Sequence, residues 1–272
     1  MTALLDQYHP LTAQPFRRDA GYRELPACEP LRPYVRCFWG SDGTGGVAAP
    51  QTSLVTPDTC MDVIFSIAGD GATARFCGVN DRSFRAGASP ASGSTFAIRF
   101  YAWSARLFAD DPDMSGVKNQ FLPAEALFQR LTNELLPRLP EIPDLRGRAA
   151  LAERSLLRCL QPRRESAPLS NALETILETR GRIRVPVLAA RQQMSTRHLE
   201  RLCLSHTGLS PKQLSSLMRY QLLWRELLSA PEFDAQHAVG KYGFADQAHM
   251  LNDFRRFHTT YPAEALRQAR LS

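Results

Sequence analysis

Hydrophobic and polar positions follow two different patterns along the chain. Residues 22–121 alternate short apolar and polar runs with intervening turns, which is typical of β-strands. The expected strands are 34–39, 61–67, 74–79 and 95–101. Helical stretches follow at 104–109, 124–136 and 148–160. Strands followed by helices predict an α+β protein whose N-terminal part is a β-rich barrel or sandwich with a helical appendage.

From residue 170 onward, apolar residues recur every three or four positions, which predicts helices. We expect a first helix at 171–180 with Ser170 as its N-cap. A short helix at 187–193 and a second one at 196–206, capped by Ser195, come next. A short helix, a tight turn and a capped second helix form a helix-turn-helix, a motif that places its second helix in the major groove of DNA.

The same arrangement occurs twice in the C-terminal part. With an offset of 51 residues and no gaps, positions of matching character align: Leu188, Ala189, Ser195, His198, Leu199, Cys203 and Pro211 correspond to Val239, Gly240, Asp246, His249, Met250, Phe254 and Pro262. Residues 212–229 between the repeats are expected to form one long amphipathic helix. The C-terminal part is therefore predicted to be all-α, with helix-turn-helix units at about 185–208 and 235–259. A spacing near ~34 Å would let both second helices enter successive major grooves.

Charge and turn residues are distributed unevenly between the two parts. The 272 residues carry a net charge of +6, and residues 170–272 hold 14 Lys and Arg against 9 Asp and Glu. The same segment has only 4 of the 19 prolines and 4 of the 16 glycines, as expected for helices. A polar stretch bracketed by prolines, 161–168, is the expected interdomain linker. The basic C-terminal part favours a negatively charged partner.

Several stretches of the two units carry a family signature. The first unit contains Leu188-Ala189-Ala190, Ser195-Thr196-Arg197-His198-Leu199-Glu200-Arg201-Leu202 and Gly208-Leu209-Ser210-Pro211. The second contains Gly243-Phe244-Ala245-Asp246-Gln247-Ala248-His249, Asp253-Phe254-Arg255-Arg256-Phe257 and Pro262. Over residues 168–269 the chain closely resembles the AraC/XylS family of bacterial transcription regulators. The resemblance implies a sequence-specific regulator, activator or repressor, whose DNA-binding domain spans 168–269.

A second signature precedes the DNA-binding part. It consists of Leu31-Arg32-Pro33-Tyr34-Val35, Phe38-Trp39, Thr56-Pro57-Asp58-Thr59-Cys60-Met61-Asp62, Cys77-Gly78 and Arg99-Phe100. This pattern resembles an uncharacterised sensor-type domain found ahead of such modules. The resemblance implies that residues 1–165 form a cupin-like β-barrel that binds an effector, dimerises, or does both. The implied partners are promoter or operator DNA, RNA polymerase for an activator, an unidentified small-molecule effector and a second copy of the chain.

The solvent-facing positions in the first half of each second helix are the expected base readers. Carried over from the family, they are Arg197, Glu200 and Arg201 in the first unit and Gln247, Ala248 and Asn252 in the second. Arginine can bond a guanine edge, Gln or Asn an adenine, and Glu a cytosine amino group. Thr196, Arg255 and Arg256 suit phosphate oxygens. The alternative for the first unit is a solvated helix face whose charges form ion pairs with one another.

The two units differ in ways that affect both stability and recognition. The second unit lacks the glycine that the first has at 208, so a left-handed helix end there costs about 1 kcal/mol. Ala248 and Asn252 also offer less hydrogen-bonding reach than the arginines of the first unit. We therefore expect the first recognition helix to carry more of the specificity.

The densest chemistry of the N-terminal part lies at Asp58, Cys60 and Asp62, for which three interpretations compete. A metal site needs more ligands, yet His9 is the only histidine before residue 198. A thiol sensor would use Cys60 with Cys77 on a neighbouring strand and needs a lowered thiol pKa. The favoured interpretation is structural, with a turn at Asp58 and Asp62 paired to an arginine.

Other classes of protein are less consistent with the sequence. There is no Gly-rich phosphate loop, GxSxG or HExxH motif, so no enzyme is expected. The alternative function is a thiol- or ligand-responsive regulator with a cryptic enzymatic or DNA-repair activity in the N-terminal domain, and a DNA-coating protein without specificity is a further rival. The six cysteines form no CxxC pair, so neither a metal nor a cofactor is expected. Without an apolar run of 18 residues or a signal peptide, we expect a cytoplasmic bacterial protein and no membrane partner.

Overall fold

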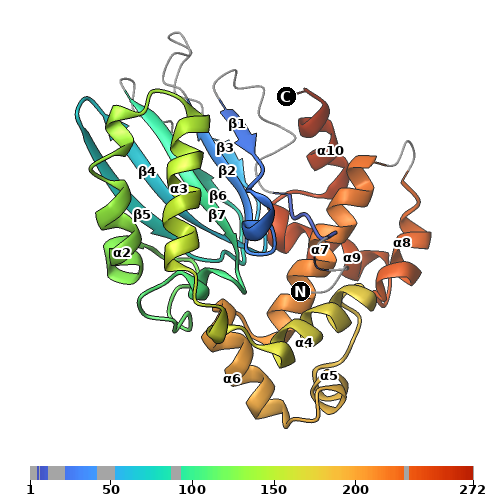
Figure 1. Ribbon diagram of the computed structural model, residues 1–272. Coiled ribbons are helices and arrows are strands. Elements are labelled where there is room, and N and C mark those ends of the chain that lie inside the picture. The colour runs from blue at the N-terminus through green and yellow to red at the C-terminus, as the bar shows by residue number, and fades with distance from the viewer. Residues whose placement is uncertain are drawn as a thin grey trace.

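The computed structural model describes residues 5, 7–11, 22–41, 53–86, 93–229 and 233–271. A part built around a β-sheet lies beside a part built only of helices, as Figure 1 shows. This order confirms the predicted fold class, with antiparallel strands first and an all-helical region after them.

Two antiparallel sheets make up the β-structure. The larger has the order β1-β2-β7-β4-β5-β8, from β1 (Tyr22–Leu25), β2 (Val35–Ser41), β7 (Ser94–Tyr101), β4 (Cys60–Ala68), β5 (Gly71–Cys77) and β8 (Phe121–Pro123). The smaller pairs β3 (Ser53–Val55) with β6 (Phe84–Ala86). β1 and β8 are the edges of the larger sheet, so its described strands do not close into a barrel on their own. The four predicted strands correspond to β2, β4, β5 and β7, and the short strands β1, β3, β6 and β8 were not predicted.

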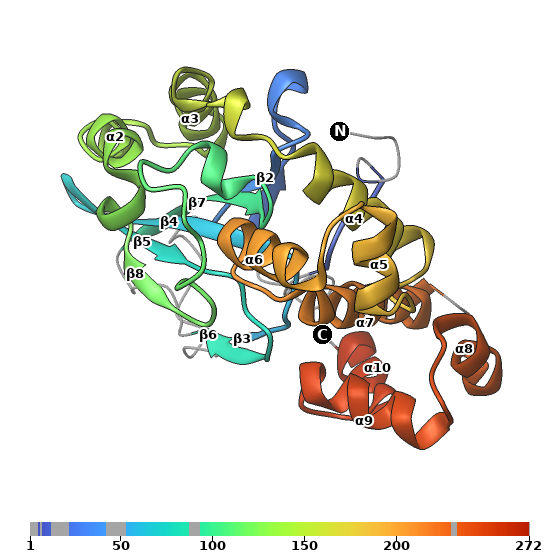
Figure 2. The same cartoon turned by 90° about the horizontal axis from the view of Figure 1, so that it is seen from below.

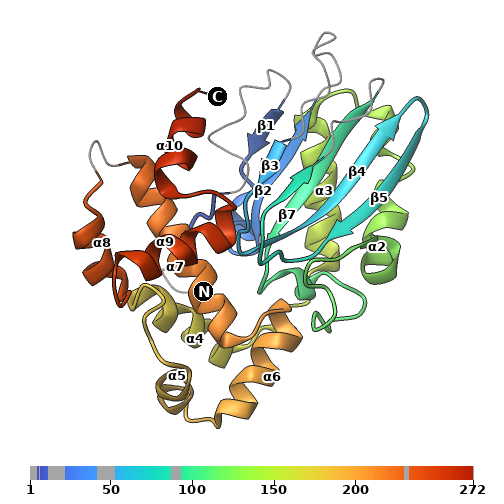
Figure 3. The same cartoon turned by 180° about the vertical axis from the view of Figure 1, so that it is seen from behind.

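One face of the larger sheet is apolar and covered by two helices. Along β4, Met61, Val63 and Phe65 are buried on this face, and Asp62 and Ile64 point to the other. Helices α2 (Glu125–Leu135) and α3 (Leu145–Cys159) lie on the same side of the sheet (Figures 1 and 3). Buried and partly exposed residues alternate along β4, as expected for a strand with only one face packed against the core. The core therefore lies between the sheet and these helices.

The helical part is arranged around one long central helix. Its helices are α4 (Ala167–Glu178), α5 (Val185–Arg191), α6 (Thr196–Thr207), α7 (Pro211–Ser229), α8 (Ala235–Tyr242), α9 (Gln247–His258) and α10 (Pro262–Leu271). α7 contacts α4, α6, α8, α9 and α10. It is the long helix expected between the two helix-turn-helix units, and Figure 2 shows the units α5–α6 and α8–α9 on different sides of it.

Three local predictions are corrected by the structure. Ser170 is not an N-cap, because α4 begins one turn earlier and the Ser166 side chain accepts from the Leu169 amide at 3.3 Å. Pro168 suits that first turn, since it needs no amide hydrogen there. The predicted helix at 104–109 is only a 3-10 turn, Ala105–Leu107. The stretch expected as a linker holds a 3-10 turn, Pro162–Arg164, and the start of α4.

The two parts pack closely against each other. Their buried apolar side chains form one continuous cluster. The Gln221 side chain of α7 accepts from the Leu11 amide at 2.7 Å and donates to the Leu11 and Pro57 carbonyls at 2.9 and 2.6 Å. The Met114 amide donates to the Ser205 carbonyl in the last turn of α6 at 3.0 Å. The sheet part therefore touches both the long helix and the first recognition helix.

Candidate functional site

The first recognition helix, α6, is fixed at both ends by local interactions. The Ser195 hydroxyl accepts from the His198 amide at 3.2 Å, as the N-cap prediction requires. Gly208 ends the helix with a left-handed backbone at φ +71°. Leu199 and Cys203 are buried. The opposite face of the helix is thereby directed to solvent.

The predicted base readers of α6 lie on that outward face. Arg197, Glu200 and Arg201 are exposed, and Thr196 is half-buried at the start of the helix. Among the described residues, the ion pairs of the helical part join other side chains: Arg219–Asp253, Lys241–Glu226, Arg256–Asp253 and Arg267–Glu264. The alternative in which ion pairs account for the charges on α6 is therefore not supported.

The second recognition helix, α9, repeats the design with different residues. The Asp246 carboxylate accepts from the His249 amide at 2.7 Å, which confirms Asp246 as the N-cap. Gln247, Ala248 and Asn252 are exposed. The helix ends at Thr259, which adopts the left-handed backbone at φ +67° where the first unit has glycine.

Arg255 and Arg256, the two arginines expected to contact phosphates, are exposed and also contact neighbouring side chains. Arg255 Nη1 donates to the Tyr261 hydroxyl at 3.1 Å, and its guanidinium lies 5.1 Å from the centre of the Tyr261 ring. Arg256 lies 4.4 Å from the centre of the Phe257 ring and 3.7 Å from Asp253 Oδ1. Both guanidiniums therefore lie near aromatic rings and keep hydrogen-bonding capacity for an anion.

Residues that were not predicted position the second unit on α7. Arg219 Nη2 donates to Asp253 Oδ2 of α9 at 2.9 Å. Glu226 Oε2 accepts from Lys241 Nζ at 2.8 Å and also from the Tyr242 hydroxyl, both in α8. In the sequence, Arg219 stands among the apolar positions of the long helix. A charged residue at such a position is rarely buried without a partner, and this was the one sequence sign of the ion pair.

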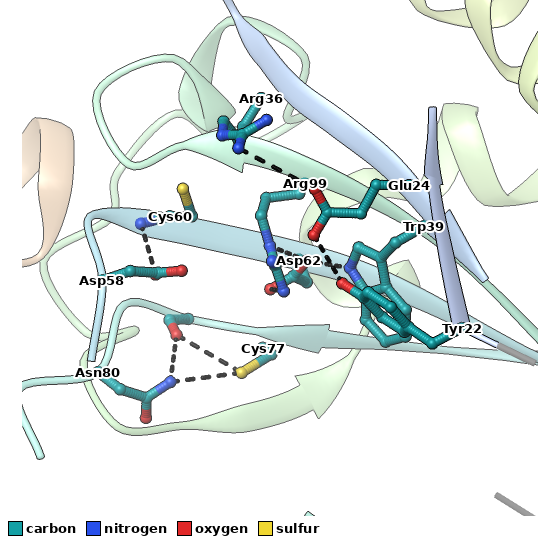
Figure 4. Close-up of polar contacts among 11 residues, drawn as sticks. Tyr22, Glu24, Arg36, Trp39, Asp58, Cys60, Asp62, Cys77, Asn80 and Arg99 are labelled. Atoms are coloured by element: carbon teal, nitrogen blue, oxygen red, sulfur yellow. Dashed lines mark hydrogen bonds and ion pairs between the residues drawn. The ribbon is translucent and has the colours of Figure 1, made fainter. Parts of the chain in front are cut away.

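The polar residues of the N-terminal part gather on the face of the sheet opposite α2 and α3 (Figure 4). Asp62 accepts from Arg99 Nε at 2.9 Å and from Trp39 Nε1 at 2.7 Å. Asp58 accepts from the Cys60 amide at 2.9 Å, which closes a turn into β4. Both features of the structural interpretation are therefore present, the turn at Asp58 and the pairing of Asp62 with an arginine.

The two thiols meet one requirement of a sensor and fail the other. β4 and β5 are neighbours, with Asp62 opposite Cys77, so Cys60 and Cys77 lie on adjacent strands. However, burial followed by the nearby Asp58 raises the pKa of Cys60 well above its usual value. Burial, assisted by Asp62, raises the pKa of Cys77 to about 12. These raised pKa values do not meet the requirement of a thiol sensor for a lowered thiol pKa.

Two further features of the described residues bear on candidate sites. Among them, no group of three or more His, Cys, Asp or Glu side chains could hold a metal ion. Within the same residues, none of the helices combines the length and the apolar character needed to cross a membrane.

The helices α6 and α9 share one arrangement: each has a side-chain N-cap, follows a short helix and exposes a polar face. This arrangement defines a DNA-binding protein with two helix-turn-helix units. Residues 188–268 match the family described as a helix-turn-helix domain, and residues 23–123 match a domain of unknown function (DUF6597). The C-terminal part of the chain therefore carries an AraC-type helix-turn-helix domain, and the N-terminal part carries the domain of unknown function.

Other comparisons give distant similarity. No curated protein matches the chain. Among solved structures, ToxT from Vibrio cholerae O395 has 10% identity and a TM-score of 0.42, over 80% of this chain and 94% of that one. Another structure of ToxT from Vibrio cholerae has 9% identity and a TM-score of 0.43, over 91% and 98%. Wild-type ToxT of strain SCE256 with a bound unsaturated fatty acid has 9% identity and a TM-score of 0.41, over 80% and 91%.

Proposed function

We propose that this regulator reads two successive major grooves of promoter DNA with α6 and α9. The observation that carries the proposal is the matched geometry of the two helices. Each begins at a side-chain N-cap, buries its apolar face in the helical part and exposes polar side chains in its first turns. An N-terminal turn with exposed side chains is the part of a recognition helix that contacts base edges.

The proposed base readers are those expected from the family. They are Arg197, Glu200 and Arg201 in α6 and Gln247, Ala248 and Asn252 in α9. Thr196, Arg255 and Arg256 are proposed to hold phosphates. The two arginines of α6 offer the longest reach and the most donors, so α6 is proposed to contribute more sequence specificity than α9.

We further propose that residues 1–165 form the regulatory domain and 168–269 the DNA-binding domain. The contacts of Gln221 with Leu11 and of Met114 with Ser205 support this division of labour, because they connect the sheet part to α7 and α6. A change in the sheet part could then reach the recognition helix through hydrogen bonds already in place.

The test is a binding titration on sites selected from random DNA. We expect Arg197→Ala or Arg201→Ala to cost about 1–3 kcal/mol at a single base pair and to relax specificity there. Arg256→Ala should weaken binding to all sequences and reduce the salt slope by about 1. Arg154→Ala is the control, since Arg154 is exposed on α3 in the sheet part.

Two outcomes would contradict the proposal. Equal affinity for selected and random DNA at the same salt concentration would indicate a DNA-coating protein instead. A larger loss of specificity with Asn252→Ala than with either arginine variant would contradict the leading role of α6.

A further inference from the structure

The loop between β5 and β6, residues 78–83, lies against the ends of both recognition helices. Near its start, Val79 is so close to the end of α6 that a Cβ added to Gly208 would lie 3.3 Å from Val79 Cγ1. At its end, the Ser83 hydroxyl donates to the Phe257 carbonyl in the last turn of α9. One short loop of the sheet part therefore extends from the first recognition helix to the second.

Side chains on both sides hold the loop in this place. Asp81 Oδ2 accepts from Gln213 Nε2 of α7 at 3.3 Å, and Asp81 Oδ1 accepts from Asn119 Nδ2 at 2.8 Å. The Asn119 amide also donates to the Val79 carbonyl at 2.9 Å. The loop is thus bonded to the long helix and to the segment before β8, which defines its position beside the recognition helices.

The loop exposes one arginine between its two anchoring residues. Arg82 follows Asp81, precedes Ser83 and is exposed to solvent. Lys118 Nζ lies 3.4 Å from Asp81 Oδ2, so a different cation balances the charge of that carboxylate. Among the residues that the structure describes, the ion pairs of this region do not include Arg82. Its guanidinium therefore has donors available for an anion.

Arg82 also lies beside an arginine that is proposed to hold a phosphate. Ser83 and Phe257 are hydrogen-bonded, and Arg82 and Arg256 are their immediate neighbours along the chain. Because consecutive Cα atoms are about 3.8 Å apart, the backbones of Arg82 and Arg256 lie close together. A DNA strand held by Arg256 would pass within reach of both long side chains.

The expected path of the DNA brings its backbone to this loop. A duplex with α6 and α9 in successive major grooves presents its minor groove and the flanking phosphates between the two helices. The 78–83 loop joins the ends of those helices, and β6, which follows it, lies on the side of the sheet part towards α9 (Figure 2). An arginine exposed on the loop is therefore placed to meet phosphates between the two base-reading positions.

We propose that Arg82 contacts the phosphate backbone of the DNA between the two base-reading positions, so that the sheet part contributes directly to DNA affinity. This inference rests on the proposed reading of DNA by α6 and α9 and extends it to a residue outside the helical part. A phosphate contact adds affinity and fixes register without reading sequence. The contact forms only while the loop is docked on the two recognition helices.

The test is a binding titration of the full chain at a series of salt concentrations, on a selected site and on random DNA of the same length. Each phosphate contact contributes about 0.9 to the slope of log affinity against log salt. We expect Arg82→Gln to reduce the slope by about 0.9 on both DNAs and to leave the ratio of the two affinities unchanged. Arg82→Lys keeps the charge and should retain most of the slope.

Two further variants control for charge and for docking. Arg154→Gln removes an exposed arginine of α3, on the opposite side of the sheet part from β6 (Figure 2), and should leave the slope unchanged. Ser83→Ala removes the hydrogen bond to α9 without changing any charge. It should lower the slope by less than Arg82→Gln does, because it loosens the loop but keeps the arginine.

Substitution of single phosphates locates the contact on the DNA. Methylphosphonates lack the negative charge and replace the phosphates between the two base-reading positions one at a time. At the contacted phosphate the unaltered protein should lose affinity several-fold, whereas Arg82→Gln should lose none. Equal losses in the two proteins at every position would overturn the placement of Arg82 at that backbone.

The outcomes separate this inference from the proposed function. An unchanged slope in Arg82→Gln, with specific binding by the unaltered protein, would overturn the inference and leave base reading by α6 and α9 intact. Tighter binding by Arg82→Gln would also overturn it, because the loop would then obstruct DNA. Equal affinity for selected and random DNA would contradict base reading, while a reduced slope of Arg82→Gln on random DNA would still support the phosphate contact.

Discussion

Arg219 of α7 and Asp253 of α9 form an ion pair that water barely reaches. Their nearest atoms are 2.9 Å apart, and the two side chains are only 8% and 11% exposed. The Arg219 guanidinium also lies 4.4 Å from the centre of the Phe244 ring, in the turn that precedes α9. One side chain of the long helix thus holds both the turn and the recognition helix of the second unit.

Replacing Arg219 with Met should lower the free energy of unfolding by about 3 kcal/mol, because it leaves the Asp253 carboxylate buried with only a distant partner. Urea denaturation measures the loss. The control is Arg256→Ala, which removes a largely exposed partner of the same carboxylate at 3.7 Å and should cost less than about 1 kcal/mol. Similar losses in the two variants would show that the buried pair contributes no more than the exposed one.

Thr259→Gly should stabilise the protein. Thr259 is β-branched and has a positive φ of +67°, a conformation that glycine adopts without strain. The gain should be about 1 kcal/mol, visible as a higher midpoint in urea. A lower midpoint would mean that the hydrogen bond from the Thr259 hydroxyl to the His258 carbonyl, 2.6 Å long, outweighs the strain.

Gly208→Ala should have the opposite effect at the equivalent helix end. Its φ is +71°, and an added Cβ would lie 2.9 Å from the Met114 carbonyl oxygen. We expect a loss of more than about 1 kcal/mol by thermal or urea denaturation. Gly240→Ala is the matched control, because a Cβ there meets no atom within 4 Å and alanine favours the helix. Equal effects of the two substitutions would contradict the packing argument.

Stability should fall with acid through His258. Burial lowers the pKa of His258 to about 4, whereas the unfolded chain titrates near its ordinary value of about 6.5. Between these values the unfolded state binds more protons, so the free energy of unfolding falls as pH decreases, by at most about 3 kcal/mol for this group. Urea titrations at several pH values measure the slope.

His258→Gln should reduce that slope. Glutamine can still bond the Tyr220 hydroxyl, which lies 2.8 Å from His258 Nδ1. The exposed His237 is the control, and His237→Gln should leave the slope unchanged. An unaltered slope in His258→Gln would assign the acid sensitivity to other groups, such as His206, whose pKa burial also lowers to about 4.

Gln221→Leu should loosen the N-terminal segment from α7. It removes the two hydrogen bonds to the Leu11 backbone and the one to Pro57. Hydrogen exchange at the Leu11 amide should become faster, and DNA affinity should change if this contact transmits regulation. The exposed Lys212, also on α7, provides the control variant Lys212→Ala. Faster exchange with unchanged DNA affinity would limit the contact to a structural role.

Local features of the chain were predictable because their causes are local. Ser195 and Asp246 each bond an amide three residues ahead, so the type of residue and its place before an apolar run are enough. Ser166 and Ser170 show the limit of such reasoning. Both are good caps one turn apart, and only the packing of the added turn, including buried Leu169, selects the first.

Contacts between distant parts of the sequence were not predictable. Gln221 and Leu11 are 210 residues apart, and nothing in either residue type indicates the other. The strands β3 and β6 have three residues each, too few to show an alternating pattern. The pocket that His9, Arg36 and Tyr101 line draws its residues from separate segments, so it exists only once the chain has folded.

The first recognition helix touches the sheet part near its C-terminal end. Its last turn is joined to the sheet part through Ser205, and its first two turns carry the exposed Arg197 and Arg201. Its 12 residues form a rod about 18 Å long. A tilt of about 10° about its C-terminal end would move its N-terminal end by about 3 Å, close to the ~3.4 Å rise of one base pair. A tilt of that size, transmitted through the hydrogen bond between Met114 and Ser205, would shift the exposed arginines by nearly one base-pair step.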